Sequence, residues 1–177
     1  MEDIFSTKDR INILENIIYT DNPISVNLIA KNLKISKGLV SKYFAVLLRY
    51  GVTKKHNGKY IIVNSHITKA IKILLNVFNI DIKIFKKFDF VESVGLYGSC
   101  AKGENSEDSD VDIWIKIKDV NDEKLAALTS LLNKKIKNIK LLFLTDKKIE
   151  KIKKEDEIFY HSLAFGSIIL YGDNNGI

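Results

Sequence analysis

The pattern of apolar and polar positions divides the first third of the chain into three predicted helices and a hairpin. Apolar residues recur at helical spacing through residues 7–20, 25–33 and 36–50. Asn57 and Gly58 then separate two strand-like runs, and this dipeptide is the strongest short-range hairpin signal. The predicted order is therefore helix, helix, helix and a lysine-rich hairpin.

The remaining chain mixes helical and strand-like patterns. Residues 66–87 have helical spacing and are predicted to form a connector. A strand is expected over residues 91–97, and a second apolar run begins close to Asp110. These patterns predict an α+β protein. We expect three parts, which are residues 1–65, 66–87 and 88–177.

Positive charge is concentrated in the N-terminal part of the chain. The formal net charge is +6, and residues 1–65 hold ten Lys and Arg against five Asp and Glu. The hydrophobic share of 46% is enough for a core. The apolar runs are too short to span a bilayer, and the polar start is unlike a signal peptide. We therefore expect a cytoplasmic protein with no membrane partner.

The basic N-terminal part resembles the winged helix-turn-helix domain of prokaryotic regulators over residues 7–64. The resemblance lies in "LIAKNLKISKGLVSKYFAVLLRYGVTKK". It implies that the third helix enters the major groove of duplex DNA while lysines neutralise phosphates. Alternatively, this domain is a protein-contact or dimerisation surface, including that of a homodimer. The DNA-facing candidates are Lys37, Ser41, Lys42 and Tyr43 on the helix, and Lys54, Lys55, His56 and Lys59 on the wing.

The segment "GLYGSCAKGENSEDSDVDIWI" concentrates the candidate chemistry. Gly98 lets the backbone approach a ligand closely, and Ser99 offers a hydroxyl beside N–H groups that suit phosphate oxygens. Asp110 and Asp112 project from the same face of a strand and repel each other unless a cation lies between them. A Mg²⁺ ion that also binds substrate phosphates meets this need. Either half alone is explained equally well by a simple turn or a solvated strand edge.

Together the two halves resemble the signature of the DNA polymerase beta-like nucleotidyltransferase superfamily, a Gly-Ser pair, a ten-residue spacer and Asp-x-Asp. The minimal nucleotidyltransferase branch is the most similar, and residues 159–173 resemble its closing helix and strand. The expected fold is a small mixed sheet flanked by helices, after the N-terminal winged helix. The resemblance implies transfer of AMP from ATP with Mg²⁺, to a protein acceptor such as a HEPN-type toxin. It assigns catalysis and metal binding to Asp110 and Asp112, and nucleotide binding to Gly98, Ser99, Lys102 and Ser109.

One position departs from the superfamily pattern, which has a third carboxylate on the strand after the intervening helix. Strand alternation places Lys140 at the equivalent position, and Asp146 is the nearest acid in the sequence. Two alternatives therefore stay open for the third group, a lysine or Asp146 reached through a bent backbone. Three functions stay open with them. The first is an active nucleotidyltransferase, the second is a DNA-binding regulator with a weak or inactive nucleotide site, and the third is an interaction protein in a two-gene toxin module.

Overall fold

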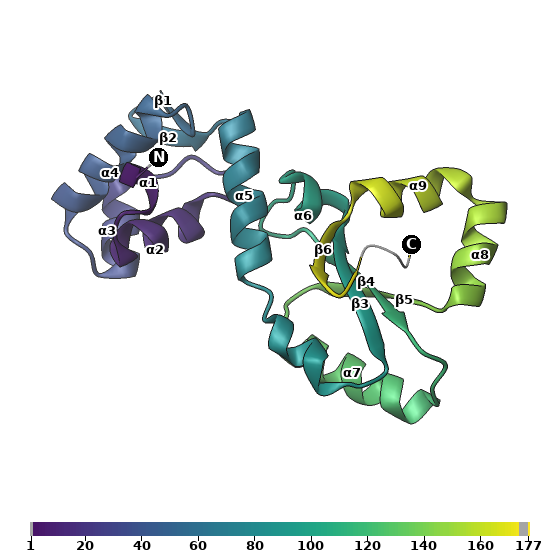
Figure 1. Ribbon diagram of the computed structural model, residues 1–177. Coiled ribbons are helices and arrows are strands. Elements are labelled where there is room, and N and C mark those ends of the chain that lie inside the picture. Colours follow the sequence, from purple (N-terminus) through teal and green to yellow (C-terminus); the bar gives the residue numbers. More distant parts are fainter. Residues whose placement is uncertain (1, 174–176) are drawn as a thin grey trace. The chain divides into compact units, whose positions relative to one another are not determined.

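The computed structural model describes residues 2–173 and 177, and the chain forms two compact units, Met1–Lys72 and Ile73–Ile177. The division falls inside helix α5 (His66–Phe78), within the stretch predicted to be a connector. Figure 1 shows the elements of both units. Among the described residues, no helix is long and apolar enough to cross a membrane.

The N-terminal unit contains the three predicted helices and the hairpin, and it begins with an additional short helix. The Asn57-Gly58 turn has φ angles of 47° and 73°, and two successive positive φ values are typical of a type I′ hairpin turn. Its elements are α1 (Glu2–Phe5), α2 (Lys8–Ile17), α3 (Val26–Leu33), α4 (Lys37–Arg49), β1 (Thr53–His56) and β2 (Lys59–Ile62).

Helix α4 begins at a regular cap, because the Ser36 side chain accepts a hydrogen bond from the backbone N–H of Leu39. Its buried residues include Tyr43, which we had expected to face DNA. That expectation is wrong. Tyr43 is fully buried, and its hydroxyl donates to the carbonyl of Ile4 at 3.0 Å, because Val40, Tyr43 and Leu47 lie on one helical stripe.

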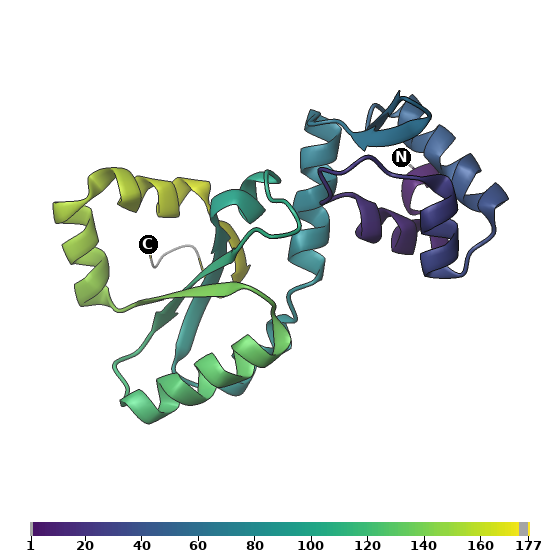
Figure 2. The same ribbon diagram turned by 180° about the vertical axis from the view of Figure 1, so that it is seen from behind.

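The C-terminal unit is built on a four-stranded mixed sheet in the order β5-β4-β3-β6. Strand β3 pairs antiparallel with β4 and β6, whereas β4 and β5 are parallel. Figure 2 shows this sheet from behind. The elements are η1 (Ile82–Lys87), β3 (Val91–Tyr97), α6 (Gly98–Lys102), β4 (Val111–Ile117), α7 (Asp122–Lys135), β5 (Ile139–Leu144), α8 (Asp146–Glu155), α9 (Glu157–Gly166) and β6 (Ile168–Tyr171).

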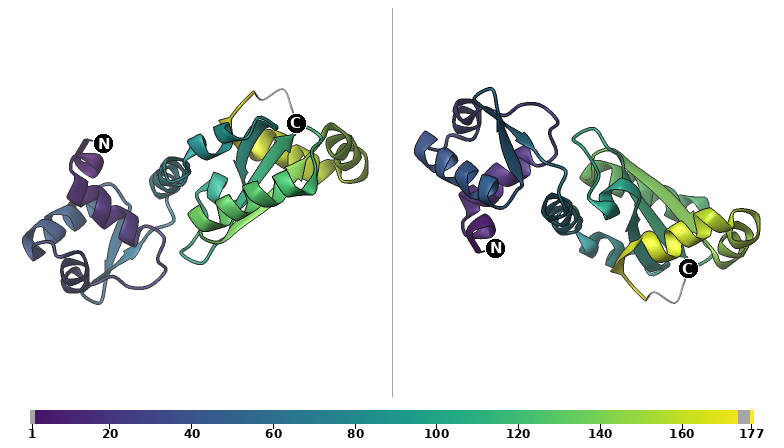
Figure 3. Two further views of the ribbon diagram at one scale, coloured as in Figure 1. Left: turned by 90° about the horizontal axis from the view of Figure 1, so that it is seen from below. Right: turned by 90° about the horizontal axis from the view of Figure 1, so that it is seen from above.

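Alternation along β4 gives the sheet two different faces. Ile113 and Ile115 join the core beneath α7 and η1, whereas Trp114 packs with residues of α8 and α9. In Figure 3, α7 lies in front of the sheet from below and α9 lies in front of it from above. Asp112, two residues before Trp114, therefore belongs to the face that α8 and α9 cover.

Candidate functional site

The candidate site lies where β4 begins, on the face of the sheet that carries Trp114. Asp112 is the second residue of β4, and it pairs with Tyr97 on β3 and with Lys140 on β5. Asp110 precedes the strand directly. The strand therefore starts one residue later than the sequence predicted, and the two aspartates occupy the loop end and the strand itself.

Lys140 reaches the aspartate pair, as strand alternation predicted. Its ammonium lies 2.6 Å from Oδ2 of Asp110, and the Lys140 and Asp110 side chains are 64% and 44% exposed. The hydrogen bond from Lys140 to Asp110, together with the charge of that carboxylate, raises the pKa of Lys140. A fixed positive charge therefore lies at the place where the sequence pattern led us to look for a third acid.

Gly98 packs directly against Asp112. Its φ angle is +69°, which L-residues with side chains rarely adopt. A Cβ atom at position 98 would lie 2.5 Å from Oδ2 of Asp112, which is closer than van der Waals contact allows. The backbone angle therefore favours glycine here, and a side chain at position 98 would also displace the Asp112 carboxylate. The turn after β3 therefore packs closely against the Asp112 side chain.

Helix α6 and the loop after it are held by hydrogen bonds of their own. Gly103 ends α6 with a φ of 66°, and the N–H of Glu104 donates to the carbonyl of Ser99 at 2.9 Å. The hydroxyl of Ser109 accepts from the N–H of Ser106 at 2.8 Å. Lys102 is exposed. Of the residues predicted to bind nucleotide, Ser109 therefore also holds the loop in place.

Two asparagines that the sequence analysis missed fasten this loop to α5. Asn76 donates to the carbonyl of Cys100 at 2.8 Å and to Oδ1 of Asn105 at 2.9 Å, and Asn105 is buried. An asparagine within the apolar run "ILLNVF" was the available signal, because a buried amide needs hydrogen-bond partners.

Burial shapes the electrostatics around Asp112. Burial raises its pKa, Lys140 opposes that shift, and Asp110 adds to it. Burial and the charge of Asp112 also raise the pKa of the Cys100 thiol to about 11. The thiol lies 3.4 Å from the carbonyl of Asp110 as a weak donor. Cys100 is therefore a packed, protonated residue of α6 rather than a nucleophile.

Comparison with protein families matches residues 80–172 to the family described as polymerase beta, nucleotidyltransferase. The chain belongs to this family. The match begins inside the predicted connector and covers the sheet and the site. It therefore assigns a nucleotidyltransferase domain to the C-terminal unit.

Solved structures give weaker similarities. One is a chain of the complex of a tri-AMPylated HEPN toxin from Shewanella oneidensis with an MNT antitoxin, at 17% identity, TM-score 0.38, and 58% and 75% of the two chains covered. Another is a candidate nucleotidyltransferase from Sulfolobus solfataricus, which is 20% identical with a TM-score of 0.38 over 63% of this chain and 90% of the other. A third is a chain of a toxin-antitoxin complex with AMP-PNP, which is 18% identical with a TM-score of 0.36 over 63% of this chain and 77% of the other. No curated protein matches the chain.

The nucleotidyltransferase family implies a divalent metal, and the residues of this chain fit one ion better than two. Across residues 2–173 and 177, no three His, Cys, Asp or Glu side chains gather closely enough to hold a metal. Mg²⁺, however, takes one or two protein carboxylates and completes its shell with water and substrate phosphates. Asp110 and Asp112 supply two carboxylates, and Gly98 keeps the space beside Asp112 free of a side chain.

Asp146 is excluded as the third acidic group of this site. It is the first residue of α8, and its carboxylate lies 3.0 Å from the ammonium of Lys116. Lys116 is four residues beyond Asp112 on β4, which is about 13 Å along a strand. The proposal that a bent backbone brings Asp146 to the aspartate pair is therefore wrong. Strand β5 pairs with β4 in continuous parallel register as far as Lys116, and Asp146 follows the end of β5 that is remote from Asp112.

The predicted DNA-facing residues are all exposed apart from Tyr43. They come from the start and outer side of α4, from β1 and from the first residue of β2, and Lys55 lies with its ammonium 5.6 Å from the centre of the Tyr60 ring. The exposed candidates are Lys37, Ser41, Lys42, Lys54, Lys55, His56 and Lys59.

Proposed function

We propose that this chain is a Mg²⁺-dependent nucleotidyltransferase that transfers AMP from ATP to a protein acceptor. The observation that carries the proposal is the fit of Gly98 against Asp112, with Asp110 two residues away. Glycine adopts this positive φ without strain, and its missing side chain leaves the backbone beside the carboxylate pair open to a close approach by phosphate oxygens.

Each part of the site has a role in this reaction. Asp110 and Asp112 would hold the magnesium ion, which offsets the charge of the phosphates and of the leaving pyrophosphate. The backbone at Gly98 and Ser99 would bind phosphate oxygens, and the exposed Lys102 would add a positive charge. An acceptor hydroxyl would then attack the α-phosphorus. These roles rest on the chain's own carboxylates, glycine and lysine.

The acceptor that we propose is a HEPN-type toxin. The support is the likeness of residues 98–112 to the minimal nucleotidyltransferase branch, whose members modify such toxins on tyrosine. A toxin gives the transferase a protein hydroxyl as its acceptor.

The experiment is incubation of the full chain with each α-labelled nucleoside triphosphate, Mg²⁺ and a lysate of the source cell. We expect one labelled protein band, strongest with ATP. The double variant Asp110→Asn and Asp112→Asn should lose labelling by about 100-fold or more, because the metal ligands are removed. Asp108→Asn is the matched control, since Asp108 is an exposed acid of the same loop. Equal labelling by the double variant would refute the proposal.

A second function is favoured by the exposed lysines of the N-terminal unit and by the ion pair of Lys140 with Asp110. In this alternative the chain is a DNA-binding regulator whose nucleotide site binds a nucleoside triphosphate but transfers the nucleoside monophosphate only weakly. Binding of duplex DNA without labelling of any lysate protein would favour it. Absence of a DNA shift at about 50 mM salt would leave the N-terminal unit as a protein-contact domain.

A further inference from the structure

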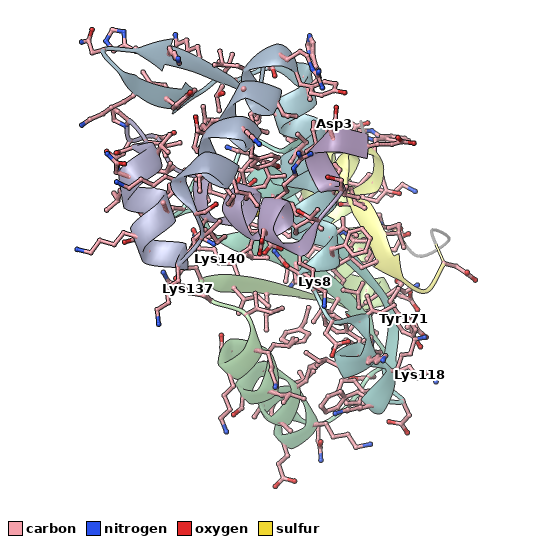
Figure 4. The ribbon with its side chains drawn as sticks, turned by 90° about the vertical axis from the view of Figure 1, so that its left-hand side faces the viewer. Asp3, Lys8, Lys118, Lys137, Lys140 and Tyr171 are labelled. Atoms are coloured by element: carbon pink, nitrogen blue, oxygen red, sulfur yellow. The ribbon has the colours of Figure 1, made fainter. Side chains whose placement is uncertain are left out.

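Lys140 occupies a specific place in the site rather than a random place on the surface. Parallel pairing sets it beside Asp112, and its ammonium lies 2.6 Å from Asp110. Figure 4 shows Lys140 well separated from Lys118, the lysine that follows the far end of β4. Lys140 lies on β5 beside the aspartate pair, whereas Lys118 follows the opposite end of β4.

We infer that Lys140 is a built-in cation of this site, which contacts the triphosphate of a bound nucleotide and replaces a second divalent ion. The site then takes one divalent ion with each nucleotide. The inference rests on the proposed function, because it assumes that Asp110 and Asp112 hold a metal-bound triphosphate.

Charge explains why one lysine is enough. In two-metal phosphoryl-transfer sites, a second divalent ion needs a further carboxylate to bind it. That carboxylate and that ion together carry a net charge of plus one, which is the charge of a single ammonium group. Replacing both by Lys140 therefore leaves the positive charge presented to the phosphates unchanged. It also removes the ligand that a second ion needs.

Geometry leaves the ammonium able to serve a ligand. An ammonium group has three N–H donors and no acceptor, and the ion pair with Asp110 uses one of them. The Lys140 side chain is 64% exposed, so its other donors are open to solution. Phosphate oxygens can thus be bound without breaking the contact with Asp110. An exposed ion pair adds little to stability, so a stabilising role does not account for it.

The test counts metal ions rather than turnover. Mn²⁺ binding is measured by electron paramagnetic resonance on the full chain with saturating α,β-methylene ATP, which cannot transfer its nucleotide. The affinity of the Mn²⁺–nucleotide complex is measured by calorimetry. The variants are Lys140→Gln, Lys140→Asp and the control Lys118→Gln, which removes an equally exposed charge about 20 Å along the sheet from Asp112.

We expect one tightly bound Mn²⁺ in the wild type and two in Lys140→Asp. Lys140→Gln should keep one ion and weaken binding of the complex by on the order of tenfold or more, since a charged hydrogen bond is lost. Lys118→Gln should match the wild type. Two ions in the wild type would overturn the inference, as would tighter binding by Lys140→Gln, which would mean that the ammonium blocks Asp110. Either result leaves the proposed function standing, whereas no nucleotide binding by any form refutes both.

Discussion

Lys42 in the N-terminal unit is exposed on a helix whose opposite side is buried in the core, whereas Lys140 in the C-terminal unit is ion-paired with an aspartate. The first arrangement is what folding alone produces on the outside of an amphipathic helix. The second brings together residues from two strands and a loop. Exposure of a single lysine therefore defines no site by itself, whereas Lys140 is placed beside two carboxylates by the pairing of β4 with β5.

Glycines repeat this contrast. Gly38 lies in the first turn of α4, and a Cβ atom there would meet nothing within 4 Å. Gly98 has a positive φ, and a Cβ atom there would collide with Asp112. Gly38 is therefore open to substitution by alanine, whereas Gly98 is constrained by its backbone angle and by Asp112, and substituting both glycines tests the contrast.

The largest effect is expected from Gly98→Ala. The methyl group must push the Asp112 carboxylate away, and a displacement of about 1 Å in a catalytic group costs on the order of 100-fold in rate. The backbone angle adds a folding cost of roughly 1–2 kcal/mol. AMP transfer and urea unfolding of the purified variant measure the two effects separately.

Gly38→Ala is the matched substitution in the N-terminal unit. It should leave transfer unchanged and stabilise the fold by about 0.5–1 kcal/mol, because alanine is the better helix former and has room. If Gly98→Ala kept full activity, the fit of Gly98 against Asp112 would be mere packing, and the contrast between the two glycines would vanish.

Sequence patterns predicted much of this site because its residues lie close together in the chain. The Gly-Ser pair and the aspartates are local signals, and the third position of the superfamily pattern together with strand alternation led to Lys140. The contact of Asn76 with Asn105 joins residues 29 apart in the sequence, and no pattern connected the two positions. Asp146 was misplaced for a similar reason. Its distance from Asp112 depends on the parallel register of β4 and β5, which the sequence did not define.

A smaller effect is expected from Lys42→Glu on the proposed binding of duplex DNA. If about six phosphates are neutralised, log K should fall with log salt at a slope of about −5. Reversing the charge of Lys42 should weaken binding several-fold and lower that slope. Fluorescence anisotropy over a salt series measures both quantities.

Lys8→Glu is the control for that experiment, since Lys8 is an exposed lysine of α2 outside the predicted DNA surface. Equal losses for Lys42→Glu and Lys8→Glu would show attraction by net charge alone. The exposed lysines would then be a solvated face, and only the C-terminal unit would have a defined binding site.

The smallest effect concerns Tyr43, which the helix pattern assigned to the wrong side. The expectation failed because tyrosine is equally at home on a DNA-facing surface and in a core, where its hydroxyl then needs a partner. Here the partner is the carbonyl of Ile4, which belongs to α1, a short helix that the sequence analysis did not predict. The misassignment of Tyr43 and the missed helix α1 are thus the same error.

Burial raises the pKa of Tyr43 far above its ordinary value of 10.0, with Arg10 opposing the shift. The folded protein therefore keeps the phenol proton where the unfolded chain loses it. The stabilisation is complete below about pH 10 and is lost as the pH rises toward the folded pKa. Tyr43→Phe should lower the free energy of unfolding by about 1 kcal/mol at pH 7, because a hydrogen bond is lost. The difference in stability between wild type and variant should be smaller at pH 11. Urea unfolding at both pH values measures it. A stability difference that stayed the same at both pH values would mean that Tyr43 ionises as readily in the folded protein as in the unfolded chain, which would return it to the surface where the sequence first placed it.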